Sequence, residues 1–523
     1  MDMEQMLGTI SSGMLIRQAL VIVFFCVLGY VFIWATGSEL KKGMRAILSF
    51  PVGLSFFCVG VYSMLVVKIR ISPPRLVFVL FFAFISVCLL SSFLRGRLHF
   101  GRKPDLEDFD IRFFSVFVLI AAAVALFCCS GILSVSLDND SYYYYSTYPQ
   151  ILIKEGDLKY EFDVLLTDSG IMTVVINTIP YLFGFLNTFG IQHFLNIDFL
   201  LLFCAALFFE ISDTGLSREP GVLENIRKNR KEAVLSLAVT VFLATSPAYI
   251  TTAKWIMAGD YFMVFFFLLM YLGYRETQEG QEIPFVLMMF TVMTAMMRQE
   301  GPIMAAFLIV CLSMLDYSNK KLATIYMLPL IIAAGYYYLR VFIFLRVYPL
   351  YAFLTKQKAL LIMGGLILLL VYISFIRRRW FSRLEERMTI LIPAALIVLN
   401  VLMLVKNHGR YLENLYAFFM NIRLRNGWGY FGYFFFVFLV LSLAAAMIKK
   451  DMRLSFFDVI MVGYILLAVC AAWGRGDYLR IGTGDSGNRV MLTAVPLITF
   501  SISIRLFRQF TAGKPSDDRI GSP

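Results

Sequence analysis

The sequence is poor in charged residues. Of its 523 residues 59% are hydrophobic and only 16% are charged, and the mean hydropathy is +0.76. A soluble chain of this length needs far more charge on its surface. Apolar runs of about 20 residues, the length that crosses the hydrocarbon core of a bilayer, recur from end to end and leave no room for a large soluble domain. The composition therefore predicts an all-α, polytopic membrane protein.

Histidine is scarce, and cysteine occurs in no informative pattern. There are three histidines, and the eight cysteines all stand inside apolar runs, without the spacing of a zinc ligand set. Cysteine is a common small residue of apolar interiors. We therefore expect buried free thiols, no disulfide and no zinc site.

A net charge of +12 is the next feature, and it can indicate nucleic-acid binding. In a membrane protein, however, basic residues gather in cytoplasmic loops. We therefore place five basic clusters inside: 95–103, 227–231, 377–387, 449–453 and 505–514. This orientation predicts about 13–15 transmembrane helices. The expected spans lie near residues 17–36, 46–67, 75–94, 112–136, 193–211, 233–250, 260–274, 284–298, 302–316, 321–344, 358–376, 388–405, 429–448, 455–473 and 490–507.

Three segments need separate treatment. Residues 17–36 lack the basic region and cleavage site of a secretory signal before them, so we expect a retained span. Residues 169–185 are apolar, but counting them as a span would move the cluster 227–231 outside, so we predict a helix lying in the outer interface. Residues 68–75 fall outside despite their basic charge, which leaves the topology of the first three helices open.

The outer loop after residue 136 carries most of the acidic residues that stand outside. Asp138 and Asp140 come where the chain leaves a span, and partial burial there raises the proton affinity of a carboxylate. A general base or a metal ligand needs such an environment. Four consecutive tyrosines follow, Tyr142 to Tyr145, of which Tyr143 and Tyr144 are candidates for stacking on sugar rings. A solvated acidic loop and an interfacial aromatic belt are the alternatives.

The order of these features resembles the first outer loop of the GT-C superfamily of membrane glycosyltransferases. That superfamily includes the protein O-mannosyltransferases and the lipid A aminoarabinose transferase. In it an acidic residue after the first core span is followed by an aromatic residue and, about fifteen residues later, by a glycine. Asp140 stands 16 residues before Gly156 and Asp138 stands 18 before it, so Asp140 matches slightly better.

Later segments extend the resemblance. Lys254 and Asp260 stand where the superfamily's second outer loop often carries another functional carboxylate. Residues 297–302, MRQEGP, resemble a charged element between two later spans. Residues 488–500 resemble an arginine-aromatic-leucine run near the C-terminus, with Val490 in place of the aromatic residue. The resemblance covers about residues 112–345 and 488–500, and it implies a GT-C-like bundle whose large first core outer loop carries interfacial helices.

Basic residues on the outer side support an anion site independently of any family. Such residues run against the positive-inside bias, and arginine binds phosphate through two parallel hydrogen bonds. The candidates for binding a donor phosphate are Arg489, Arg480, Arg298 and Lys254. Glu300, Arg423 and Arg425 are candidates for contacts to the acceptor or the sugar. The alternative for each arginine is an ion pair with Glu300, Asp477 or Asp485, or contact with lipid headgroups.

The resemblance implies a division of the chain and a function. Residues 1–111 would be N-terminal transmembrane helices, residues 112–345 the core with its catalytic outer loop 137–192, and residues 346–523 C-terminal helices with outer basic loops. The protein would move a sugar from a polyprenyl-phosphate donor to a glycan, lipid or protein acceptor on the outer face, by inverting displacement. By default we expect a bacterial plasma membrane and a role in building the cell envelope.

In that mechanism Asp140, or Asp138, takes the proton of the acceptor hydroxyl, and Asp260 orients the acceptor. Some members of the superfamily need a divalent ion and others do not. A Mg²⁺, Mn²⁺ or Ca²⁺ ion at Asp138, Asp140 and Asp260 therefore stays open. Nucleic acid is not an expected partner. The identities of the sugar and the acceptor, and the oligomeric state, do not follow from the sequence.

Two other functions remain as alternatives. A polysaccharide polymerase or ligase also uses lipid-linked sugars, but the large outer loop of such proteins usually comes late in the chain. A lipid-linked sugar flippase or other transporter often has internal repeats and broken helices near mid-membrane. We find no repeat by inspection, and we expect no charged residues at the centres of the spans.

Overall fold

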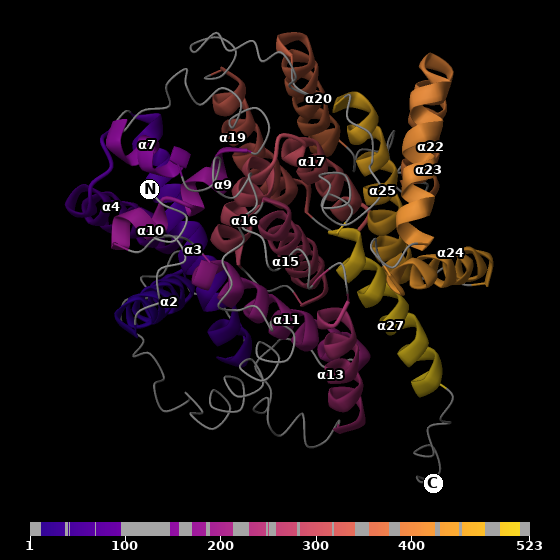
Figure 1. Ribbon diagram of the computed structural model, residues 1–523, viewed down its shortest axis with the longest axis horizontal. Helices are drawn as coiled ribbons and strands as arrows, with labels where there is room; N and C mark the ends of the chain where they lie inside the picture. The colour runs from indigo at the N-terminus through magenta and orange to yellow at the C-terminus, as the bar shows by residue number, and fades with distance from the viewer. Residues whose placement is uncertain are drawn as a thin grey trace.

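The computed structural model describes residues 12–36, 40, 42–67, 69–95, 147–155, 170–184, 189–212, 230–246, 249, 258–279, 283–315, 318–339, 355–375, 388–423, 429–448, 452–475 and 492–512. Within these ranges every regular element is helical, as the sequence predicts (Figure 1). The helices of the first half are α2 (Ser12–Ala35), α3 (Lys42–Val66), α4 (Pro73–Arg95), α7 (Tyr148–Glu155), α9 (Ile171–Ile176), α10 (Ile179–Phe183), α11 (Phe189–Ile211) and α13 (Arg230–Ala244).

The second half continues the same all-helical pattern. Its helices are α15 (Ala258–Glu279), α16 (Pro284–Met297), α17 (Gly301–Leu312), α18 (Asn319–Lys321), the π-helix η5 (Leu322–Met327), α19 (Leu328–Tyr338), α20 (Lys356–Phe375), α22 (Met388–Lys406), α23 (His408–Arg423), α24 (Phe431–Ile448), α25 (Met452–Arg475) and α27 (Ala494–Ala512). Figure 1 shows α15, α16 and α17 in the middle, with α2 to α4 on one side and α22 to α24 on the other.

Five of the described helices are long and apolar enough to cross a membrane, by length and composition. They contain the spans Ile16–Ala35, Met44–Leu65, Pro73–Ser91, Ile191–Ile211 and Lys356–Phe375. Shorter apolar helices accompany them, among them Pro284–Met297 and Gly301–Leu312. This arrangement is consistent with the multi-pass membrane protein that the composition predicts. The larger count of 13–15 spans stays a prediction, and the expected span 112–136 lies outside the described residues.

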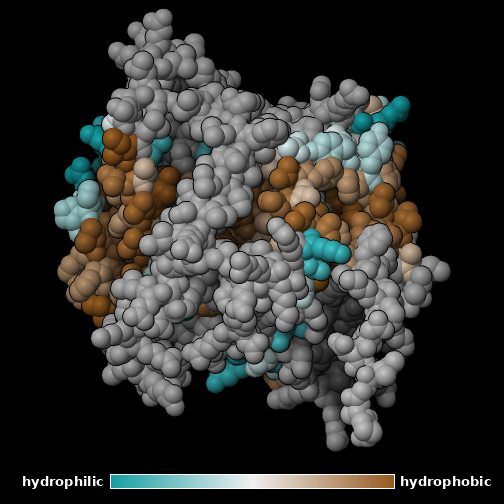
Figure 2. Space-filling model, turned by 90° about the horizontal axis from the view of Figure 1, so that it is seen from below, coloured by the Kyte–Doolittle hydropathy of each residue, from teal (hydrophilic) through white to brown (hydrophobic). Residues whose placement is uncertain are grey.

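The helices divide into an inner set and an outer set. Most side chains of the α3 and α11 spans are buried, whereas α2, α4 and α20 bury less than a third of theirs. The exposed side chains of the outer helices are large and apolar, such as Phe78 on α4 and Leu361 on α20. Figure 2 accordingly shows brown, hydrophobic surface on both flanks of the molecule. Lipid is the environment in which such a surface is stable.

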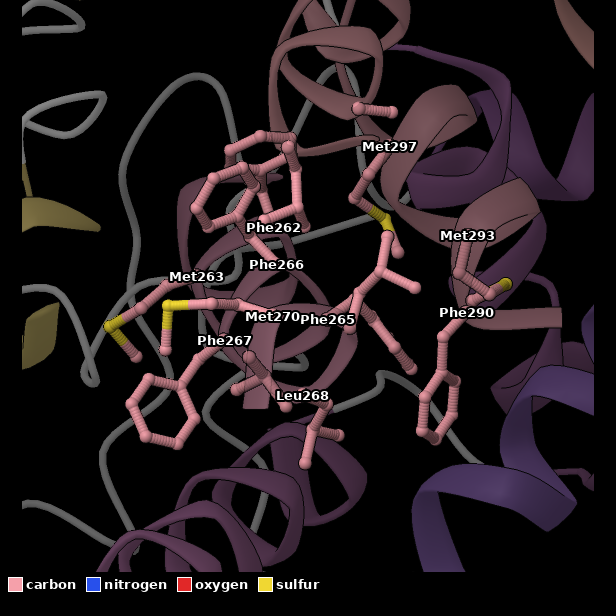
Figure 3. Packing of buried hydrophobic residues seen from close by; sticks show 14 of the residues in the cluster. Phe262, Met263, Phe265, Phe266, Phe267, Leu268, Met270, Phe290, Met293 and Met297 are labelled. Atoms are coloured by element: carbon pink, nitrogen blue, oxygen red, sulfur yellow. The ribbon is translucent and has the colours of Figure 1, made fainter. Parts of the chain in front are cut away.

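Helix α15 is at the centre of the inner set. Each residue from 259 to 276 is buried, so no face of the helix is left for solvent or lipid. Figure 3 shows its Phe and Met side chains pointing to several sides, with Phe290, Met293 and Met297 of α16 next to it. A helix that is hydrophobic all round belongs in a protein interior. The structure therefore fixes α15 on all sides, including its first turn, where Asp260 lies.

The apolar segment 169–185 differs from our expectation of a helix in the outer interface. It forms two short helices, α9 and α10, separated at Asn177 and Thr178. All six residues of α9 are buried, and α9 packs against α3, α7 and α16. The polar residues of the segment, Thr173, Asn177 and Thr178, are buried as well, whereas an interfacial helix needs one polar face in contact with water. Their side chains bond to backbone carbonyl groups instead of water.

Candidate functional site

Helices α11 and α15 run side by side in the same direction. Polar contacts join them at both ends: Gln192 with Asp260 at one end, and Glu210 with Arg275 at the other. Between these contacts the helices meet through aromatic rings, for example Phe199 against Phe267. The partners in the first pair are 68 residues apart in sequence and those in the second pair 65. Because these separations are nearly equal, facing residues of the two helices keep almost the same offset from one end to the other.

Asp260 is the central carboxylate of the candidate site. It lies in the first turn of α15 and is 3% exposed. Its Oδ2 atom accepts a hydrogen bond of 2.8 Å from Nε2 of Gln192. The first turn of a helix favours negative charge because the backbone N–H groups there are unpaired. The amide and the helix end together hold this carboxylate in one orientation inside the protein.

An ion pair between Arg298 and Glu300 lies where α16 passes into α17. Nε of Arg298 donates to Oε1 of Glu300, and both side chains are more than nine-tenths buried. Arg298 has extended backbone, so the chain leaves α16 sharply before Gly301 begins α17. A buried charge requires a partner, and each residue supplies it to the other. The structure thus gives Arg298 the partner Glu300 that the sequence offered as an alternative to a bound phosphate.

Two glycines fix the backbone of this turn. A Cβ atom on Gly301 would lie 2.4 Å from the carbonyl oxygen of Ala295. A Cβ atom on Gly170, which has a φ of +76°, would lie 2.5 Å from the carbonyl carbon of Met297. The side chain of Thr173 adds a hydrogen bond of 2.9 Å to the carbonyl oxygen of Met297. Helix α9 is therefore in direct backbone contact with the residues that position Arg298.

The Asp260 contact and the ion pair lie at the same end of the central helices. Phe265 packs against Phe290 on the antiparallel helix α16, which places Asp260 level with the last turn of α16. Arg298 follows directly after that turn. Tyr464 of α25 is buried close enough to interact electrostatically with Arg298 and Glu300. We call Gln192, Asp260, Arg298, Glu300 and Tyr464 the central polar layer.

The chemistry available to the central polar layer follows from its members. It contains two carboxylates and one guanidinium, of which one carboxylate and the guanidinium neutralise each other. The carboxyl group of Asp260 accepts a hydrogen bond from a neutral amide. A carboxylate in this setting can accept a hydrogen bond from a substrate hydroxyl or take up its proton. Because Arg298 is already paired, it offers less positive charge to an anion than an isolated arginine would.

The remaining predicted site residues are in other parts of the chain. Arg423 is exposed and is the last residue of α23, which packs against α22, α24 and α25. The others lie outside the described residues: Asp138, Asp140, Tyr143, Tyr144, Lys254, Arg425, Arg480 and Arg489. Of the predicted set, the structure therefore brings Asp260, Arg298 and Glu300 to one end of the central helices.

Sequence reasoning missed the polar residues of α11. Gln192, His193, Asn196 and Asp198 are all buried in the first half of this otherwise apolar helix. Asp198 lies near the middle of the span Ile191–Ile211 and is an exception to our expectation that spans carry no charged residues at their centres. Polar residues repeated at helical spacing in an apolar run were the available signal, because such residues face the protein interior.

The described residues give no support for a bound divalent ion. Among the described residues, no group of three or more His, Cys, Asp or Glu side chains could hold a metal ion. Asp260 is bonded to an amide, and its two expected companions, Asp138 and Asp140, are not described. We therefore derive no chemical step through a metal.

Comparisons of the chain with protein-family models, with curated proteins and with solved structures find no match.

Proposed function

We propose that this protein is a membrane glycosyltransferase that moves a sugar from a polyprenyl-phosphate donor to an acceptor hydroxyl on the outer face of the membrane. The observation that carries the proposal is the buried contact of Asp260 with Gln192, level with the Arg298–Glu300 pair. A carboxylate kept inside a bundle of apolar helices is costly, and in membrane proteins such residues usually serve function. The resemblance to the GT-C superfamily gives that function its chemical class.

The position of the layer supports the proposal. The chain enters α15 from the segment 250–257, which carries Lys254, and enters α27 from the segment 476–491, which carries Arg480 and Arg489. Helix α27 runs beside α11 and α15, as the contacts of Phe500 with Phe203 and Phe267 show. The basic residues of the proposed phosphate site therefore stand in sequence just ahead of α15, which carries Asp260, and of α27, which packs beside it.

The roles in the proposal follow from charge. Asp140, with Asp138 as the alternative, takes the proton from the acceptor hydroxyl as the acceptor oxygen attacks the anomeric carbon. The bond from that carbon to the phosphate oxygen breaks, and polyprenyl phosphate leaves as an anion. Arg480, Arg489 and Lys254 stabilise this anion. Asp260 orients the acceptor, and Arg298, held by Glu300, maintains the backbone around it.

A transfer assay tests the proposal. The full-length protein is purified into nanodiscs and given a panel of radiolabelled polyprenyl-phosphate sugars with crude envelope acceptor. Release of polyprenyl phosphate is measured for the wild type and for Asp138→Asn, Asp140→Asn and Asp260→Asn. Loss of a general base lowers turnover by about 10²–10⁴-fold. We expect a loss of this size in Asp140→Asn or Asp138→Asn.

Glu232→Gln is the matched control, because Glu232 lies in the first turn of α13, away from the proposed machinery. Its turnover should equal that of the wild type. No turnover with any donor, in protein that binds lipid-linked sugar and keeps this binding in all three Asp variants, would favour a flippase or a polymerase instead.

A further inference from the structure

Three cations gather at one end of α20, α22 and α23, apart from the central polar layer. Lys358 stands in the first turn of α20, Lys406 is the last residue of α22, and Arg410 lies in the first turn of α23. Lys358 is close enough to interact electrostatically with both Lys406 and Arg410. In Figure 1, α22 and α23 stand on the side of the molecule away from α2 to α4, and α20 stands next to α19 near the top. We call these three residues the cation cluster.

The fold brings the three residues together through contacts elsewhere on the helices. Tyr372 near the end of α20 contacts the sulfur of Met388 at the start of α22, at 3.5 Å, so the two helices run antiparallel. Their opposite ends, with Lys358 and Lys406, are therefore neighbours. Tyr411 of α23 hydrogen-bonds Asn400 of α22 at 2.9 Å and so holds the first turn of α23 against α22.

An aromatic ring lies beneath two of the cations. Trp473 of α25 has the Lys406 ammonium 5.6 Å from its ring centre and the Arg410 guanidinium 5.7 Å from it. Cations bind to the face of a tryptophan ring through its negative π-electron density. The ring therefore holds both cations on the same side of α25.

Two of the three cations, Lys406 and Arg410, have no acidic partner within the part of the chain that the structure describes. Among the same residues, Nε and Nη2 of Arg410 are buried without a hydrogen-bond partner. Like charges held close together repel one another, and buried donors of a charged group are costly when unpaired. The start of α23 adds unpaired backbone N–H groups. Each of these costs is removed by an anion bound between the cations.

The surface beside the cluster is apolar. Val405, next to Lys406, is 77% exposed, and Leu361, one turn after Lys358, is 78% exposed. Leu412 of α23 is also exposed. Lys358 lies at the start of a candidate membrane span, which is the level of lipid headgroups. A ligand that satisfies both surfaces has a negative headgroup and apolar chains.

We propose that Lys358, Lys406 and Arg410, with Trp473 beneath the last two, form a binding site for the phosphate of an anionic membrane lipid. The phosphate oxygens accept hydrogen bonds from Arg410 and from the two lysines, and the acyl chains lie along the exposed apolar residues of α20 and α22. The site uses none of the residues to which the glycosyltransferase proposal assigns a role, so either proposal can fail without the other.

Lipid-dependent thermal stability tests this site. The full-length protein is purified in a zwitterionic detergent, depleted of lipid, and melted with increasing phosphatidic acid, phosphatidylcholine or inorganic phosphate. We expect phosphatidic acid to raise the melting temperature of the wild type well above the effect of phosphatidylcholine. Lys406→Gln and Arg410→Gln should weaken the apparent affinity for phosphatidic acid about tenfold or more, because each removes a charge-assisted hydrogen bond.

Two control variants accompany these. Lys406→Arg keeps the charge and should keep the affinity, and Lys320→Gln, at an exposed lysine on α18, should bind as the wild type does. Without lipid, Lys406→Gln should melt no lower than the wild type, since it relieves repulsion. Wild-type affinity in both Gln variants, or equal stabilisation by phosphatidylcholine, overturns the site. Equal stabilisation by inorganic phosphate at matched concentration overturns its assignment to a lipid.

Discussion

Arg275 of α15 donates a hydrogen bond of 2.8 Å to Glu210 of α11, although 65 residues separate them in the sequence. Both side chains are at least nine-tenths buried. At the other end of the same two helices, Gln192 donates a hydrogen bond to Asp260. The ion pair therefore sets the register in which α11 and α15 meet, and with it the position of the central polar layer.

Removing one partner of this pair should destabilise the protein strongly. Glu210→Gln removes the carboxylate that pairs with the buried Arg275 guanidinium, and breaking a buried ion pair costs about 3–5 kcal/mol in comparable cases. Unfolding of the detergent-solubilised protein by denaturant measures the change. We expect the double variant Arg275→Met with Glu210→Met to recover much of the loss, because it leaves no unpaired charge. A double variant as unstable as Glu210→Gln would contradict this reasoning.

The contact between α2 and α3 should not tolerate a side chain at Gly29. A Cβ atom there would lie 1.7 Å from the carbonyl oxygen of Ser49. Gly29→Ala should therefore push the helices apart and lower the melting temperature, with a loss of about 1–3 kcal/mol in stability. Gly364→Ala is the control, since nothing lies within 4 Å of the added atom. The control should be neutral or stabilising by up to about 1 kcal/mol.

Gln192 should support the function of Asp260. Gln192→Leu removes the hydrogen bond that orients the carboxylate, and misplacing a positioning group can lower turnover by about 10²-fold. The measurement is turnover in the transfer assay. A double variant, Gln192→Glu with Asp260→Gln, is measured alongside, because it exchanges the carboxylate and the amide between the two positions. Equal turnover in Gln192→Leu and the wild type would remove this contact from the mechanism.

Asp198 should be replaceable by an apolar residue with a gain in stability. Its side chain is 2% exposed and its Oδ2 atom is buried without a hydrogen-bond partner. An unsatisfied buried polar atom costs about 1–3 kcal/mol. Asp198→Leu should therefore raise the melting temperature in detergent. A lower melting temperature would show that the carboxyl group makes a contact that stabilises the fold.

Part of the site could be predicted from single residues. Asp260, Arg298 and Glu300 stand at the ends of apolar runs, where a polar residue is conspicuous, and the possibility that Arg298 pairs with Glu300 follows from their closeness in sequence. Gln192 was not predicted, because its role depends on a partner 68 residues away. The cation cluster was missed for the same reason: its members come from three helices, and only the antiparallel course of α20 and α22 and the packing of α23 on α22 make them neighbours.

The sequence by itself determined the helical class, the low surface charge and the ends of most helices, because these depend on composition and on the length of apolar runs. It could not determine which helices are central. Helix α15 and helix α20 are both apolar, yet the first is buried on all sides and the second is exposed along most of its length. Only the tertiary structure decided this, and with it the partners of Asp260 and Arg298, because burial and pairing depend on which neighbours the whole chain packs around each helix.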